Sequence, residues 1–171
     1  MLAYPPKPTA ILPHESSIKD YIIQPKWRGW RIAIHDNKSW TRKGVPIPVT
    51  HNYPKKDYEY QLDGEIISID KEVEHQVRKA IKENRYAVRI FDIWIPSRPD
   101  MTIEERLQLL NEDFGIVVET YEAKTGKEVE ALFKMFTTRG NEGLVMKKRG
   151  SKYLTSNGPT NPIDNNWSKI R

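Results

Sequence analysis

The chain has 171 residues, a formal net charge of +5 and no cysteine. This length can bury a core without disulfides, and the lack of cysteine excludes thiolate catalysis and cysteine-liganded zinc. The excess of 28 Lys and Arg over 23 Asp and Glu favours a polyanionic partner. No stretch reaches the apolar length of a membrane span, so we expect a soluble, intracellular or cytoplasmic monomer without a membrane partner.

The N-terminal segment, residues 1–17, is rich in proline. Proline lacks the amide donor that helices and central strands need, so we expect an extended lead-in before an ordered domain at 18–171. Between residues 21 and 35, β-forming residues flank a polar break, which predicts a strand, a turn and a second strand. Lys26 is thereby predicted to lie where the first strand meets the turn.

Residues 58–69 are a candidate strand pair, and 70–83 have the charge density and apolar spacing of a surface helix. Residues 86–95 are a predicted strand. Thr102 and Glu105 have the spacing of a capping box, which predicts a helix through residue 110.

Residues 116–120 are largely β-branched and predict a strand, whereas 125–138 have the apolar spacing of an amphipathic helix. Residues 143–148 predict a short strand, and 167–171 are the last element. The interleaving of strands and helices predicts a mixed fold with several antiparallel strand pairs.

Charged groups that are unusual for strands recur at the predicted strand ends. They are Lys26-Trp27-Arg28-Gly29-Trp30-Arg31, Thr41-Arg42-Lys43-Gly44, Asp63-Gly64-Glu65, Phe91-Asp92, Glu142-Gly143-Leu144-Val145-Met146-Lys147 and Trp167-Ser168-Lys169-Ile170-Arg171. Each alone has an ordinary explanation as a solvated loop or a core residue. Their order along residues 24–171 resembles the covalent nucleotidyltransferase superfamily, which contains ATP-dependent DNA ligases, RNA ligases and mRNA capping enzymes.

The resemblance implies an α+β fold in which two antiparallel sheets with flanking helices surround a nucleotide cleft. This is a ligase-type, ATP-grasp-like nucleotidyltransferase domain, here expected without an OB-fold domain. Such a chain would be a naturally minimal ligase, a piece of a longer protein, or an enzyme whose partner supplies the OB-fold functions.

By the same resemblance, Lys26 is the nucleophile that attacks ATP and carries AMP covalently, with Lys169 and Arg171 as further catalytic residues. The residues expected to bind the nucleotide are Gln24, Pro25, Lys26, Arg31, Arg42, Glu65, Phe91, Lys147 and Lys169. Glu65 and Glu142 are expected to hold Mg²⁺ or Mn²⁺, which prefer such hard oxygen ligands. Nucleic-acid contacts are expected from Arg28, Arg42 and Lys43.

The implied reaction transfers AMP to a 5′-phosphate and joins that phosphate to a 3′-hydroxyl, with nicked duplex DNA as the expected partner. An RNA ligase and a capping-type nucleotidyltransferase are alternatives within the superfamily. A non-catalytic nucleic-acid-binding module is a third, because Arg28 replaces the aspartate of the Lys-x-Asp-Gly-x-Arg motif. We expect Arg28 to favour the neutral Lys26 amine and to weaken metal binding near the 3′-hydroxyl.

Overall fold

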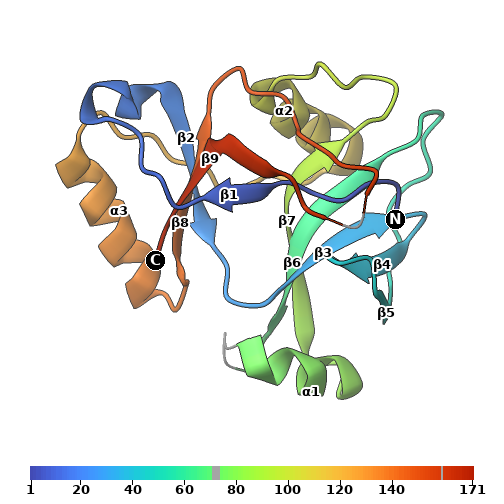
Figure 1. Ribbon diagram of the computed structural model, residues 1–171. Coiled ribbons are helices and arrows are strands. Elements are labelled where there is room, and N and C mark those ends of the chain that lie inside the picture. The colour runs from blue at the N-terminus through green and yellow to red at the C-terminus, as the bar shows by residue number, and fades with distance from the viewer. Residues whose placement is uncertain (71–73, 159) are drawn as a thin grey trace.

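The computed structural model describes residues 1–70, 74–158 and 160–171, in which two sheets lie side by side (Figure 1). The smaller sheet has the order β1 (Lys7–Thr9), β9 (Ile163–Ile170), β8 (Gly143–Lys148) and β2 (Tyr21–Lys26). The larger has the order β5 (Pro46–Thr50), β4 (Lys38–Thr41), β3 (Trp30–His35), β6 (Gln61–Ser68) and β7 (Tyr86–Trp94). The predicted α+β class with two sheets is confirmed, although β1 pairs with β9 in parallel.

The larger sheet packs against helix α2 (Ile103–Phe114). The expected capping box of Thr102 and Glu105 starts this helix, and Gly115 ends it in the left-handed conformation at φ 65°. Ile103 and Leu110 are fully buried on the helix face that meets the sheet. The helix that the capping box predicted is thus present, and its apolar side chains recur at the 3.6-residue spacing of one buried face.

The smaller sheet is covered by helix α3 (Gly126–Thr138), which lies on its outer side (Figure 1). The Thr125 side chain caps the helix by accepting a hydrogen bond from the Glu128 amide. Phe136 of α3 is fully buried, in one cluster with Ile23 of β2 and Leu144 of β8. Each sheet thus has its own apolar core, and polar residues are free to face the space between the sheets.

Two short 3₁₀ turns and one short helix connect the strands. A 3₁₀ turn, η1 (Glu15–Asp20), precedes β2, and a second, η2 (Glu74–Gln76), leads into helix α1 (Val77–Lys82). Val77 and Ala80 of α1 are 0% and 3% exposed, which anchors the helix at one end of β6 and β7. The predicted helix at 70–83 is thus shorter than expected, and its residues 71–73 lie outside the described part of the chain.

Two other expectations need correction. Residues 58–69 contain the single strand β6, because β6 pairs with β3 and β7 and not with an adjacent hairpin partner. Residues 116–120 are all described and form no strand, although Tyr121 bridges Ile23. Strands β4 and β5 were not predicted.

The N-terminal segment, residues 1–17, is an integral part of the fold and contains β1 and the first residues of η1. Ala3 is 3% exposed, and its carbonyl accepts a hydrogen bond of 2.9 Å from the Gln61 side chain. The Lys7 amide donates to the Pro162 carbonyl where β1 joins the smaller sheet. Order therefore begins well before Ile18, because residues distant in sequence supply the hydrogen-bond partners of this proline-rich strand.

Candidate active site

A cleft of ≈ 880 Å³ lies between the two sheets and is lined by residues from both. Every residue that the sequence predicted for the site lines this cleft. They are Gln24, Pro25, Lys26, Arg28, Arg31, Arg42, Lys43, Glu65, Phe91, Glu142, Lys147, Lys169 and Arg171. The structure thus brings the six dispersed motifs to one place.

Lys26 is the last residue of β2, at the predicted junction of strand and turn. Its carbonyl accepts a hydrogen bond of 2.8 Å from the Glu142 amide, which fixes the start of β8 beside it. Its side chain is 15% exposed, and its ammonium forms an ion pair with the Glu142 carboxylate. Arg171 lies on the other side of Glu142, with 3.3 Å between Nε and Oε1.

The turn after Lys26 requires a glycine at position 29. A Cβ atom there would lie 2.2 Å from the Ile66 carbonyl oxygen, a distance that no real contact allows. The Gly29 amide donates a hydrogen bond of 2.9 Å to the Glu65 carboxylate. The close approach of turn and strand β6 thereby places Glu65 next to the lysine.

The pKa of Lys26 is lowered to about 8, first by burial and then by the charges of Arg171, Lys169 and Arg31, while Glu65 opposes the shift. The ion pair with Glu142 also favours the charged amine while it persists. Arg28 is exposed and is not among the charges that lower this pKa. The expectation that Arg28 favours the neutral amine therefore finds no support in the structure.

Glu65 and Glu142 both offer carboxylate oxygens near Lys26. Burial raises the pKa of Glu65 to about 7, against the lowering effect of Lys26, Arg31 and the Gly29 amide. No group of three or more potential metal-binding side chains occurs in the described residues. Mg²⁺ commonly binds through one or two carboxylates and substrate phosphates, so this pair fits such an ion when a nucleotide is present.

Gln24 and Phe91 form the inner part of the cleft. Gln24 is 3% exposed, and its Nε2 donates to the Phe91 carbonyl at 3.4 Å. The Phe91 ring has the Lys147 Nζ at 5.0 Å and the Arg31 Cζ at 5.5 Å from its centroid. The apolar ring suits the stacking of a planar heterocycle, and the fixed cations beside it suit the phosphate groups attached to that heterocycle.

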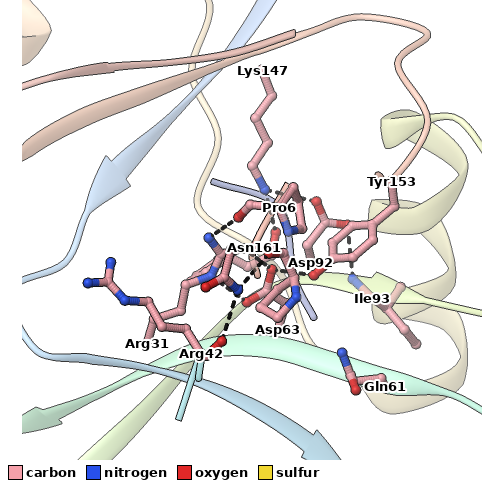
Figure 2. Close-up of polar contacts among 12 residues, drawn as sticks. Pro6, Arg31, Arg42, Gln61, Asp63, Asp92, Ile93, Lys147, Tyr153 and Asn161 are labelled. Carbon is pink, nitrogen blue, oxygen red and sulfur yellow. Dashed lines mark hydrogen bonds and ion pairs between the residues drawn. The ribbon is translucent and has the colours of Figure 1, made fainter. Parts of the chain in front are cut away.

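Beneath the cleft, two fully buried carboxylates hold the predicted cations Arg31 and Lys147 (Figure 2). Asp63 accepts from Arg31 Nε at 2.9 Å, and the Arg31 guanidinium also donates to the Pro6 carbonyl. Asp92 accepts from Lys147 Nζ at 2.9 Å. Both cations thus have protein partners, and their contact with nucleotide phosphates stays a prediction.

The sequence alone did not reveal the other members of this network. Arg106 of α2 pairs with Asp92 at 2.7 Å, and the Tyr153 hydroxyl donates to Asp63 at 2.6 Å. The capping box of Thr102 and Glu105, which placed Arg106 on a helix, was the one available signal. Tyr153 has no such signal, because a long irregular segment brings it to β6.

Three more cations line the cleft without having been predicted: Lys7, Arg78 and Lys82. Lys7 reaches the site because β1 pairs with β9, which no local pattern indicates. Arg78 and Lys82 have the spacing of one helix face, and this spacing could have been noticed.

Comparisons with known proteins agree with this geometry. A family model described as "ATP dependent DNA ligase domain" matches residues 1–171. No curated protein sequence matches the chain. None of the helices in the described part of the chain combines the length and apolarity that crossing a bilayer requires.

Three solved structures are similar in fold at low identity. A Lig E DNA ligase described as binding DNA with a minimal scaffold has a TM-score of 0.70 at 18% identity, over 90% of this chain and 62% of its own. Chlorella virus DNA ligase-adenylate has a TM-score of 0.72 at 16% identity, over 100% and 69%. An archaeal ATP-dependent RNA ligase has a TM-score of 0.58 at 20% identity, over 81% and 43%.

The chain spans 62% of the length of the Lig E ligase structure and 46% of the length of another similar structure, described as Pmar-Lig_PreS3. At these identities the structural likeness shows the fold alone, and the family model carries the assignment. The match extends over the whole chain and agrees with the six motifs that meet in the cleft. The chain therefore belongs to the ATP-dependent DNA ligase domain family.

Proposed function

We propose that this domain forms a covalent lysyl-AMP intermediate at Lys26 and uses it to join a 5′-phosphate to a 3′-hydroxyl in nicked duplex DNA. The observation that carries the proposal is Lys26 itself, a largely buried amine whose pKa is lowered to about 8 in a cleft lined with cations. At pH 7 a pKa of 8 leaves about a tenth of the amine neutral, against about one part in 3,000 at the ordinary value. Such an amine is a competent nucleophile at neutral pH.

In the first step, neutral Lys26 Nζ attacks the α-phosphorus of ATP. The new N–P bond forms as the bond to the bridging oxygen breaks, and pyrophosphate leaves with that electron pair. Lys169 and Arg171, next to Lys26 in the cleft, would stabilise the charge that develops on the phosphate oxygens. The Lys26 nitrogen becomes positively charged when it bonds to phosphorus, and it releases one proton to solvent to give the phosphoramidate.

In the second step, a 5′-phosphate oxygen attacks the same phosphorus, the N–P bond breaks, and Lys26 takes up a proton. In the third, a 3′-hydroxyl attacks the activated 5′-phosphate and gives up its proton to solvent, a phosphodiester forms and AMP leaves with the bond electrons. Arg42 and Lys43 would position the strand at the mouth of the cleft.

A divalent ion held by Glu65 and Glu142 would supply Lewis-acid stabilisation of the phosphate oxygens when it is bound. Binding of this ion by Glu142 would also end the ion pair between Glu142 and Lys26. The loss of that ion pair favours the neutral amine. Gln24 and Phe91 would hold the adenine, since they form the inner part of the cleft.

An RNA ligase is the second candidate, because the fold is also similar to that of an archaeal RNA ligase. The cleft chemistry is the same for both, so the substrate decides between them. DNA is favoured by the family model and by the Thr41-Arg42-Lys43-Gly44 and Trp167-Ser168-Lys169 elements.

The test is intact-mass spectrometry of the purified protein with ATP and magnesium, followed by sealing of nicked DNA and nicked RNA. The wild type should gain the mass of one AMP, and Lys26→Ala should gain none. Lys19→Ala is the matched control, since Lys19 lies outside the cleft on η1, and it should still be labelled.

Labelling with GTP in place of ATP would favour a capping-type enzyme. An unlabelled protein that still binds nicked duplex would indicate the binding module. Sealing of RNA alone would replace DNA by RNA as the substrate.

A further inference from the structure

The cations that line the cleft fall into two groups. One group is paired with carboxylates and consists of Lys26, Arg31, Lys147 and Arg171. Among the side chains that the structure describes, no carboxylate pairs with the others. They are Lys7, Arg28, Arg42, Lys43, Arg78, Lys82 and Lys169. The rim of the cleft therefore carries a positive charge that the described protein does not neutralise.

Part of this rim belongs to helix α1. Arg78 and Lys82 are four residues apart, so they share one helix face, and both are exposed and line the cleft. Val77 and Ala80 are buried against the sheet and fix the orientation of that face. Two like charges at this spacing repel each other and work against the helix, which an anionic ligand would relieve.

Arg28 continues the same rim from the turn between β2 and β3. This turn and α1 lie at the same end of the molecule (Figure 1). The residues on both sides of Arg28 are held in place. Gly29 is clamped against β6, and Arg89 packs over the Trp27 ring, with 5.2 Å from its Cζ to the centroid. The exposed guanidinium therefore extends from a fixed turn.

We propose that Arg28, Arg78 and Lys82, here called the α1 rim, bind consecutive phosphates of one polynucleotide strand as it leaves the cleft. This proposal rests on the proposed function, because it takes a polynucleotide as the substrate. By the proposed function a mononucleotide would occupy the inner cleft with Gln24 and Phe91, whereas a strand carries phosphates beyond it. The α1 rim reads no bases, so its contribution is independent of sequence and strongly dependent on salt.

The α1 rim also explains the charge reversal at position 28. A carboxylate there would repel a strand that follows α1, whereas arginine adds a third cation along the same path. Arg28 is exposed and is not among the main charges that act on the Lys26 amine. Its position suits a contact with the substrate backbone better than a part in charging the lysine.

The experiment measures binding of the full chain to a fluorescent nicked duplex over a range of salt concentrations. The test variant is R78Q/K82Q, and the matched control is K79Q. Lys79 lies on the same helix and is exposed, but it pairs with Glu83 at 3.8 Å and does not line the cleft. R28Q is measured alongside them.

Loss of two phosphate contacts should reduce the slope of log K against log salt by about 1.8, and R28Q should reduce it by about 0.9. At low salt R78Q/K82Q should bind roughly tenfold or more weakly than the wild type, while K79Q keeps the wild-type slope and affinity. Thermal melting by circular dichroism confirms that all variants are folded.

A slope and affinity of R78Q/K82Q equal to those of K79Q would overturn the proposal. So would a loss of AMP labelling in R78Q/K82Q at an unchanged slope, because the pair would then serve the nucleotide. If the wild type is not labelled with AMP, the proposed function fails. The salt dependence of DNA binding can still be measured in that case and still tests the α1 rim.

Discussion

Replacing Asp92 by asparagine should destabilise this domain strongly, although the two side chains are nearly the same size. Asp92 is 0% exposed and pairs with Arg106 and Lys147, which are each 1% exposed. Asparagine is nearly the same size, so the packing remains while the negative charge disappears. Two buried cations would then have lost their carboxylate partner, and leaving a buried charge unpaired strongly destabilises the folded protein.

The expected loss follows from this burial. Removing one partner of a buried pair costs about 3–5 kcal/mol, a large part of the roughly 5–15 kcal/mol that stabilises a domain. For a domain of this size each kcal/mol lowers Tm by about 2–4 °C, so the melting temperature should fall by roughly 6–20 °C. The same change should release Lys147 from its partner and lower the rate of AMP labelling.

Urea unfolding followed by tryptophan fluorescence measures the free energy of unfolding of Asp92→Asn. Asp70→Asn is the control, because Asp70 pairs with Arg85 at the surface, where both side chains are 40% exposed or more and the pair contributes little. A loss for Asp92→Asn below about 1 kcal/mol, or equal to that of the control, would refute the argument from the buried network.

The pH dependence of stability provides an independent check. Burial alone would raise the pKa of Asp92, but the charges of Arg106 and Lys147 outweigh it and hold the pKa below its ordinary value. A lowered pKa contributes stability that is complete above the unfolded value of about 3.9 and is lost as pH falls through the folded value. The difference between wild type and Asp92→Asn should therefore shrink on acidification below about pH 4.

Three further predictions concern the site. Because the pKa of Lys26 is about 8, the initial rate of AMP labelling should rise with pH to about pH 8 and then level off. A rate that still rises about tenfold per pH unit above pH 9 would contradict this. Gly29→Ala should cost about 1–3 kcal/mol in urea unfolding and also slow labelling, since its Cβ would lie 2.2 Å from the Ile66 carbonyl; wild-type values for both would speak against the close turn. Tyr153→Phe should lose about 1–3 kcal/mol, as it removes a buried hydrogen bond to Asp63, and a neutral result in the same assay would show that the bond is not needed.

Local patterns predicted much of the fold, where the stabilising interactions lie within a few residues. The capping box of Thr102 and Glu105 and the apolar spacing of residues 125–138 marked α2 and α3, because capping and helix periodicity depend on neighbouring residues. The β-branched run at 116–120 was the opposite case. It has strand propensity, but the bridge to the edge strand β2 forms at Tyr121, just beyond this run, and propensity alone does not form a sheet.

The sequence by itself determined which residues meet in the cleft, because the order of charged motifs from Lys26 to Arg171 named residues that all line it. Only the tertiary structure decided how those residues are held. The pairing of Asp63 with Arg31 and Tyr153, and of Asp92 with Arg106 and Lys147, joins positions far apart in the chain. The addition of β1 and the α1 rim to the cleft depends equally on such distant contacts, whose geometry no local pattern encodes.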